Sequence, residues 1–379
     1  MDKSPVALAN CGSYSREEAG AGLDNIISAL GGFGKFLRPG MSVFVKPNLL
    51  LGAAPEKAVT THPAVLIELI NRLQDFGAEV SFGDLPGGFH VGVTARIHRE
   101  TGMDVVAKET GAELVILEQH GFRDREILDG VTLKLIHTPK HLDTVDAIVN
   151  VCKVKTHMQS RFTGAVKNTF GLVTTQDRLH AHRHSKFEDF SEALVDIFSV
   201  MRPVLNFADG IVGMEGTGPS QGKPVKLNFL AASPDAVALD TVCASIMGFH
   251  PREIGTIEAA RRRGLGAGRL REIELLGAPL QPLLKKVKRP SSAVFALMPF
   301  ISSPMSEWST VHPVIIKDKC KKCRTCVEVC PNDAIRTGGR HFTIDDARCL
   351  KCFCCHEMCP HDAVGLDRPL LARIADLIS

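Results

Sequence analysis

The chain has 379 residues, a hydrophobic content of 44% and a formal net charge of +3, with 45 lysines and arginines against 42 aspartates and glutamates. This length predicts two or three domains, and the nearly balanced charge excludes a strongly basic surface of the kind that binds nucleic acid. The start of the chain lacks the pattern of a secretory signal peptide, and no apolar run approaches the roughly 20 residues of a bilayer-spanning helix. We therefore expect a cytoplasmic protein with no transmembrane segment and no nucleic-acid partner.

Residues 1–280 alternate strand-like and helix-like segments, which predicts an α/β domain around a mainly parallel sheet. The expected strands cover residues 43–45, 78–82, 147–151, 204–208 and 227–231, and the expected helices cover residues 64–76 and 236–247. Polar segments follow several of these strands. Because ligands of open α/β sheets bind at the carboxyl ends of strands, we expect a ligand crevice there.

The remainder of the chain divides into a linker, a second domain and a tail. Residues 281–312 are proline-containing and partly apolar, which predicts a packed linker whose contacts involve Phe295, Phe300 and Trp308. Residues 313–367 form the second domain, and residues 368–379 form a C-terminal tail.

Eight cysteines of the second domain form two copies of the pattern C-x2-C-x2-C-x3-C-P. This spacing is that of bacterial proteins with two [4Fe–4S] clusters, in which the fourth cysteine of each copy binds the cluster of the other copy. A structural zinc site would leave the third closely spaced cysteine of each copy unexplained. We expect cluster 1 on Cys320, Cys323, Cys326 and Cys359, and cluster 2 on Cys349, Cys352, Cys355 and Cys330.

Equivalent short segments follow the two copies, at residues 333–335 and 362–364, so the second domain resembles a duplicated, small α+β ferredoxin-like domain. Cys354 lies next to Cys355 but out of register, and it is interpreted as a small buried thiol. The same interpretation applies to Cys11, Cys152 and Cys243, which lie in apolar surroundings. A reducing compartment fits this use of cysteine.

Candidate site residues of the α/β domain follow the expected strands. They are Lys46, Asp84, Lys155, His157 and Lys167. Lysines are costly to desolvate unless they meet an anion, so the lysines are candidate anion-holding groups, and His157 is a candidate acid–base group or metal ligand. The alternative is that the lysines are structural. Asp84, like Asp209, is either an acid–base group or the anchor of a tight turn.

Two further segments leave alternatives open. His180, His182 and His184, with His157, suit a divalent metal, but the alternating pattern equally fits a solvated loop or strand face. Residues 210–222 are glycine-rich and contain Glu215, which fits either a lid or phosphate-approaching loop or a structural turn. No P-loop or dinucleotide fingerprint is present.

Several short motifs together resemble the prokaryotic family known as domain of unknown function 362. They are Lys46-Pro47-Asn48, Thr61-His62-Pro63, Lys153-x-Lys155-Thr156-His157, Thr163-Gly164-Ala165-x-Lys167-Asn168, Gly213-Met214-Glu215-Gly216 and Ala238-Leu239-Asp240. The resemblance spans about residues 1–280 and implies an α/β fold.

A fainter resemblance is to the N-terminal domain of lactate racemase, in which a histidine precedes, by ten residues, a lysine in a Phe-Ser-Gly-Gly-x-Lys segment. His157 and the segment 162–167 look similar, although Thr163 and Ala165 depart from that pattern. The resemblance implies a nickel-pincer cofactor anchored on Lys167, with His182 or His184 as further groups.

The leading hypothesis is an iron–sulfur oxidoreductase that relays electrons through two [4Fe–4S] clusters between a redox partner protein and a small anionic substrate or cofactor in the crevice. One alternative is a noncatalytic electron carrier or assembly partner of a larger complex. Another is a metal- or nickel-pincer-type enzyme related to lactate racemase.

Overall fold

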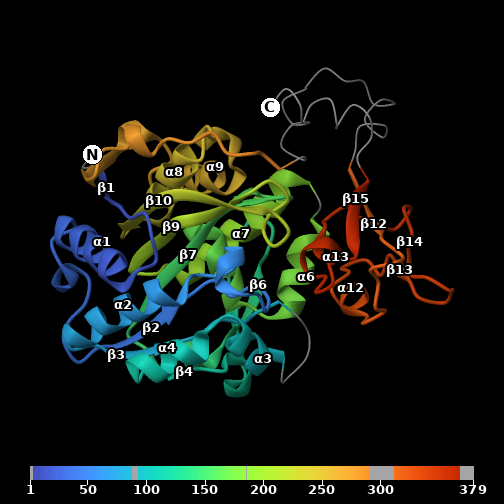
Figure 1. The fold of residues 1–379 in the computed structure, drawn as a ribbon, viewed down its shortest axis with the longest axis horizontal. Helices are drawn as coiled ribbons and strands as arrows, with labels where there is room; N and C mark the ends of the chain where they lie inside the picture. Colours follow the sequence, from blue (N-terminus) through green and yellow to red (C-terminus); the bar gives the residue numbers. More distant parts are fainter. Residues whose placement is uncertain (1–2, 88–92, 185, 291–310, 368–379) are drawn as a thin grey trace.

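The computed structural model describes residues 3–87, 93–184, 186–290 and 311–367, and it contains an α/β domain and a small C-terminal module (Figure 1). The proposed packing residues Phe295, Phe300 and Trp308, and the tail 368–379, lie outside the described residues.

The α/β domain is built on a nine-stranded sheet with the order β11-β1-β10-β9-β7-β2-β3-β4, and β8 pairs with β7. The strands are β1 (Ser4–Asn10), β2 (Ser42–Lys46), β3 (Glu79–Phe82), β4 (Glu113–Leu114), β7 (Ala147–His157), β8 (Arg161–Thr163), β9 (Leu205–Glu215), β10 (Lys223–Ser233) and β11 (Ile273–Gly277). Five pairs of neighbouring strands are parallel: β2 with β3, β2 with β7, β3 with β4, β7 with β9, and β1 with β11. Strand β10 is antiparallel to both of its neighbours, β1 and β9. The expected mainly parallel sheet is confirmed. A separate hairpin joins β5 (Phe122–Glu126) to β6 (Leu135–Pro139).

Helices cover both faces of the sheet. They are α1 (Arg16–Ala29), α2 (Pro63–Asp75), α3 (Val93–Glu100), α4 (Met103–Thr110), α5 (Ala165–Asn168), α6 (Thr175–Arg183), α7 (Phe187–Met201), α8 (Ala236–Ile246) and α9 (Gly255–Arg262). The side chains of β2 alternate, so that Val43 and Val45 join the core under α1 and α2 while Phe44 joins the core under α7. In the part of the chain that the structure describes, no helix is both long and apolar enough to cross a membrane.

The central strands β7 and β9 are longer than the sequence pattern predicts. The expected strands end at residues 151 and 208, but β7 continues through His157 and β9 through Glu215. The polar residues that follow the expected strand at residues 147–151 belong to β7 itself, and Lys153 and Lys155 are buried strand residues with partners. The glycine-rich segment 210–222 is likewise mostly strand and hairpin turn. Gly213 is needed in β9 because a Cβ atom there would lie 2.6 Å from a methyl group of Leu227.

The C-terminal module consists of two small antiparallel sheets and two single-turn helices, as expected for an α+β domain. β12 (His312–Ile315) pairs with β15 (Val364–Asp367), and β13 (Ile335–Arg336) pairs with β14 (Thr343–Ile344). The helices are α12 (Thr325–Glu328) and α13 (Cys354–Glu357). Figure 1 shows α13 on the side of the module that is nearest to α6 of the α/β domain.

Candidate functional site

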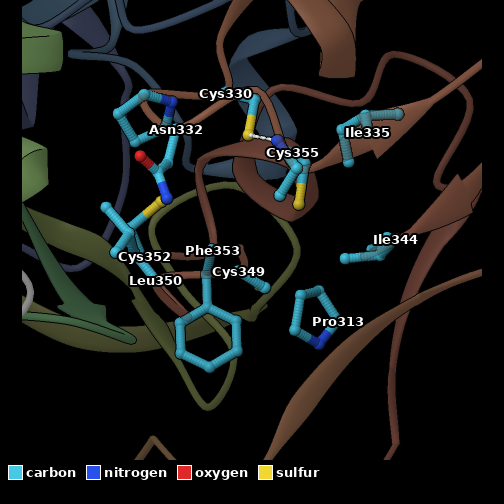
Figure 2. Close-up of a pocket in the computed structure, with 12 residues that line it drawn as sticks. Pro313, Cys330, Asn332, Ile335, Ile344, Cys349, Leu350, Cys352, Phe353 and Cys355 are labelled. Atoms are coloured by element: carbon cyan, nitrogen blue, oxygen red, sulfur yellow. Dashed lines mark hydrogen bonds between the residues drawn. The ribbon is translucent and has the colours of Figure 1, made fainter. Parts of the chain in front are cut away.

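Two cavities of the module are each lined by four cysteines. Figure 2 shows the cavity in which Cys330 lies with three cysteines of the second copy. The four are Cys330, Cys349, Cys352 and Cys355. The other cavity brings Cys359 together with the three cysteines of the first copy, Cys320, Cys323 and Cys326. We name these the second and the first cysteine cavity. Cys354 is buried and lines neither of them.

The two cavities are built by the same backbone, repeated after 29 residues. Lys322, Arg324 and Asp333 have φ angles of 55°, 68° and 48°, and the residues 29 positions later, Lys351, Phe353 and Asp362, have φ angles of 55°, 62° and 48°. Each fourth cysteine also accepts a backbone hydrogen bond at its sulfur, from Ala334 N to Cys330 Sγ at 3.1 Å and from Ala363 N to Cys359 Sγ at 3.2 Å. The two copies are therefore alike in sequence, in backbone conformation and in the hydrogen bond to the sulfur atom of the fourth cysteine.

The cysteine cavities fit an iron–sulfur cluster. Burial raises the pKa of Cys326 to about 11, and the charges of Cys359 and Cys323 add to this effect. Four thiolates around one cavity therefore repel one another unless a cationic centre compensates their charge, which iron supplies. Apolar residues line much of the second cavity, whereas Lys321, Lys322 and Arg324 also line the first. The backbone N–H groups of Ala334 and Ala363 stabilise charge on the sulfur atoms of the fourth cysteines.

The module contacts the α/β domain through α13 and the chain around it. Ser220 Oγ donates to the carbonyl oxygen of Glu357 at 2.6 Å, and the Gln221 side chain donates to the carbonyl oxygen of His356. Arg183 of α6 donates from Nε to the carbonyl oxygen of Pro331 at 2.9 Å. Apolar packing joins the same surfaces, because Met158, Val311 and Phe353 form one buried cluster.

Lys46 and Asp84 form a buried ion pair. The distance from Lys46 Nζ to Asp84 Oδ1 is 2.8 Å, and the side chains are 0% and 2% exposed. Burial lowers the pKa of Lys46 and raises that of Asp84, and each partner opposes the shift of the other. The remaining Asp84 oxygen accepts from the backbone N of Leu49 at 2.9 Å. Both candidates are thus engaged with protein groups and position the segment after β2.

The two buried lysines of β7 also have partners. Lys153 Nζ lies 2.8 Å from Asp209 Oδ2 and donates to the hydroxyl of Tyr14 at 2.6 Å. Lys155 Nζ donates to Asn48 Oδ1 and to the carbonyl oxygen of Val59, each at 2.7 Å. Asp209 is therefore the counter-ion of a lysine, and not the anchor of a turn. Burial lowers the pKa of Lys155 well below its ordinary value, and the positive charges of Lys167 and Lys153 lower it further.

His157 meets a carboxyl group of the module. Its Nδ1 accepts from the backbone N–H groups of Gln159 at 3.1 Å and Ser160 at 3.3 Å, so the proton of the neutral ring resides on Nε2. That Nε2 lies 3.6 Å from Glu357 Oε1, and the two side chains are 1% and 6% exposed. Burial, together with the charge of Lys167, holds the pKa of His157 well below its usual range. Burial raises the pKa of Glu357 to about 8, against the attraction of Lys167.

Lys167 lies close to this pair at the end of α5. The carboxylate of Asp240 accepts from the backbone N of Ala165 at 2.5 Å and of Val166 at 3.0 Å, which fixes the first turn of α5. Lys167 Nζ lies 5.0 Å from the centre of the Phe170 ring, within cation–π range. Within the described residues its ammonium group forms no hydrogen bond. Burial lowers the pKa of Lys167 to about 8, against the attraction of Glu357.

Gln159, Arg178 and His182 complete the polar cluster, which we name the interdomain site together with His157, Lys167 and Glu357. His182 Nδ1 lies 2.8 Å from Gln159 Oε1, and its ring stacks on Phe190 at 4.7 Å. Gln159 Nε2, Arg178 Nε and His157 Nε2 are buried and have no hydrogen-bond partner among the described residues. Several donors of the site are therefore unsatisfied.

The histidine-rich segment forms a helix and not a loop or a strand. His180 and His182 lie within α6, and His184 caps its end. His180 and His184 stack on each other with ring centres 5.6 Å apart, whereas His182 is buried beside Gln159. Within the described residues, these histidines and His157 do not gather into a group of three possible metal ligands.

Glu357, Arg178 and Gln159 are members of the interdomain site that the sequence pattern does not predict. Glu357 lies between Cys355 and Cys359 of the second cysteine copy, where the spacing of the cysteines is the recognisable pattern. Whether its side chain faces the α/β domain depends on how α13 packs on that domain. Arg178 lies four residues before His182 on the same helix. This spacing places Arg178 and His182 on one helix face, and it is the feature of the sequence from which their proximity could be predicted.

The fold and the site define an α/β protein that carries an iron–sulfur module. The chain belongs to the family described as "Domain of unknown function (DUF362)", which matches residues 43–245, and residues 313–336 match the 4Fe-4S binding domain family. The second domain is thus a [4Fe–4S]-binding domain.

Two relatives and one solved structure are each similar to part of the chain. The thylakoid-associated protein sll1697 of Synechocystis sp. is 32% identical over 262 residues, which cover 69% of this chain and 79% of that protein. Ketoisovalerate oxidoreductase subunit VorD of Pyrococcus furiosus is 36% identical over 53 residues, or 14% of this chain and 50% of VorD. The apoprotein of lactate racemase from Thermoanaerobacterium thermosaccharolyticum has a TM-score of 0.41 at 14% identity, covering 65% of this chain and 57% of that chain.

Proposed function

We propose that the protein is an iron–sulfur oxidoreductase that relays electrons through two [4Fe–4S] clusters between a redox partner protein and a small anionic molecule in the interdomain site. The observation that carries the proposal is the distance of 3.6 Å between His157 Nε2 and Glu357 Oε1. Because Glu357 lies between two cysteines of the second copy, this contact makes the iron–sulfur module one wall of the α/β site.

The eight cysteines hold the two clusters in this proposal. Cys320, Cys323, Cys326 and Cys359 bind cluster 1, and Cys349, Cys352, Cys355 and Cys330 bind cluster 2. Clusters of this type supply reversible one-electron transfer. The proposed organisation keeps residues 1–280 as the α/β domain, 281–312 as linker, 313–367 as module and 368–379 as tail, in a reducing, cytoplasmic location.

The charge of the interdomain site favours an anionic ligand. Lys167 has no acceptor among the described residues, and neither have Nε of Arg178, Nε2 of His157 and Nε2 of Gln159. Buried donors without acceptors are unfavourable, and a carboxylate or phosphate provides several acceptors at once. The side chains of Lys46, Asp84 and Lys155 already bind protein groups. In this proposal they stabilise the surrounding structure and do not contact the ligand.

The protein's own groups have defined tasks in a reduction. Lys167 attracts and orients the anion. Arg178 adds its charge and the free N–H at Nε, while its Nη1 donates to the carbonyl oxygens of Leu85 and Pro86. The N–H of His157 at Nε2 donates a hydrogen bond to the anion. The bound molecule gains two electrons and two protons, while two molecules of a one-electron donor each lose one electron. In this proposal Lys167, whose pKa burial lowers to about 8, delivers the protons, and water then replaces them.

Anaerobically purified full-length protein provides the test. After reduction with dithionite, the clusters are exposed in turn to 2-oxo acids, to enoates and to phosphate esters that carry a carbonyl group, each of which has a double bond that two electrons and two protons reduce. Reoxidation of the clusters is followed by visible absorbance. We expect one class to reoxidise the clusters with saturation, and Lys167→Gln to raise the half-saturating concentration about tenfold, equivalent to a lost interaction of about 1.4 kcal/mol.

The matched control is Lys108→Gln, which changes an exposed lysine of α4 and is expected to behave like the unmodified protein. Reoxidation that no anion accelerates, in a protein with full iron content, would instead support a noncatalytic electron carrier. Nickel in the purified protein would support a pincer-type enzyme.

A further inference from the structure

The two cysteine copies of the module carry different side chains at some equivalent positions. Lys321 and Arg324 of the first copy are exposed, and the residues 29 positions later are Leu350, which is half-buried, and Phe353, which is buried. Phe353 packs against Met158 of the α/β domain. At these positions the second copy thus has apolar side chains that pack on the α/β domain, and the first copy has exposed cationic side chains.

These cations surround the first cysteine cavity. Of the described residues, Lys321, Lys322 and Arg324 line it and no carboxylate does, and none with a charge lines the second cavity. Lys317 and Lys319 precede them and are also exposed. We name these five residues the basic rim. The acidic residues nearest to the basic rim in sequence are Asp318, which lies between Lys317 and Lys319, and Glu328.

The basic rim has no carboxylate partner in the part of the chain that the structure describes. Among the described residues, none of its five side chains forms an ion pair with a carboxylate of the chain. Cys323, which belongs to the same cavity, is exposed, whereas Cys352 at the equivalent place in the second cavity is buried. At this position the first cavity is therefore the more exposed of the two, and the cations beside it form no ion pair among the described residues.

We propose that the basic rim docks an acidic one-electron carrier protein, which exchanges electrons with the module at the first cysteine cavity. This proposal rests on the proposed function in that it requires clusters, and it adds the place and the charge of the partner. In each encounter the carrier loses one electron and the module gains one, with no proton or bond involved. The second cavity, on the side of α13, then faces the interdomain site.

Electrostatic docking has a measurable signature. Association between oppositely charged surfaces is accelerated by 10- to 1,000-fold in general, and the acceleration falls steeply with ionic strength. We would mix full-length holoprotein with a plant-type [2Fe–2S] ferredoxin, an acidic carrier, in whichever redox direction is downhill. Stopped-flow absorbance gives the second-order rate constant as a function of salt concentration.

The variant combines Lys321→Glu, Lys322→Glu and Arg324→Glu, and the control combines Lys35→Glu, Lys57→Glu and Lys108→Glu on exposed positions of the α/β domain, with the same change in net charge. At low salt we expect the rim variant to lose about tenfold or more in rate constant and most of its salt dependence, and the control to stay within about twofold. With cytochrome c, a basic carrier, the rim variant should become faster.

The first variant changes Lys322 and Arg324, which lie next to cysteines, and this could cause loss of clusters. A second variant controls for such a loss. Lys317→Glu with Lys319→Glu changes exposed residues that do not line the cavity, and a reduced rate constant is expected here as well. Equal rate constants for wild type and both rim variants, with iron content and dithionite reduction intact, would overturn the docking proposal. Missing iron or a missing cluster signal in the wild type would instead overturn the proposed function.

Discussion

The imidazole of His157 and the carboxyl group of Glu357 face each other across the boundary between the α/β domain and the iron–sulfur module, with Nε2 and Oε1 3.6 Å apart. This distance is too long for a direct hydrogen bond, and both atoms are buried without another partner in the described part of the chain. The hydrogen bonds of Ser220 and Gln221 to the backbone of α13 hold the two residues in this arrangement.

The Lys46–Asp84 pair is expected to be structural. Asp84→Asn leaves Lys46, which is 0% exposed, without its counter-charge, and this should lower the free energy of unfolding by about 3–5 kcal/mol. The matched control is Glu100→Gln, which removes an exposed ion pair with Arg96 and should cost less than about 0.5 kcal/mol. Urea unfolding measures both, and equal losses in the two variants would contradict a structural role for Asp84.

Gly171 lies against the same ion pair. A Cβ atom at this position would collide with Asp84 Oδ1 and would lie 2.9 Å from Lys46 Nζ. Gly171→Ala should therefore displace the pair and lower the free energy of unfolding by about 1–3 kcal/mol. Gly338→Ala is the control, because a Cβ atom there meets nothing within 4 Å. Thermal unfolding provides the measurement, and a Gly171→Ala protein as stable as the control would show that the pair can shift freely.

The sequence predicts features that depend on residues close together in the chain. The spacing of the eight cysteines reflects the geometry of a cluster, and the apolar segments of β2 and α2 follow the periods of strand and helix. The length of β7 was predicted wrongly, since the burial of Lys153 depends on Asp209, which lies 56 residues away in the chain. The presence of Glu357 in the site depends on the packing of two domains, which no local pattern encodes.

Acid pH should destabilise the protein through its buried histidines. Burial lowers the pKa of His182 to about 3 and that of His62 to about 4, from an ordinary value of 6.5. Below about pH 6.5 the unfolded chain binds protons that the folded protein does not, so stability falls as the pH falls from there toward the folded pKa values. Each group contributes a slope of about 1.4 kcal/mol per pH unit in that window.

The variant His182→Gln tests this slope. Unfolding free energies measured between pH 6.5 and pH 4 should depend less steeply on pH in this variant than in the wild type. A His182→Gln protein with the slope of the wild type would mean that the folded protein accepts a proton at His182.

The exchange of fourth cysteines between the two copies predicts which substitutions act together. If Cys330 belongs to the second cavity, Cys330→Ser and Cys349→Ser should weaken the same cluster signal in electron paramagnetic resonance, and Cys359→Ser and Cys320→Ser should weaken the other one. Iron should fall from about eight atoms per chain toward about four in each case. Cys354→Ala should keep the full iron content, because Cys354 lines neither cavity. If Cys330→Ser instead altered the signal that Cys320→Ser alters, each copy would bind its own cluster and the exchange would be wrong.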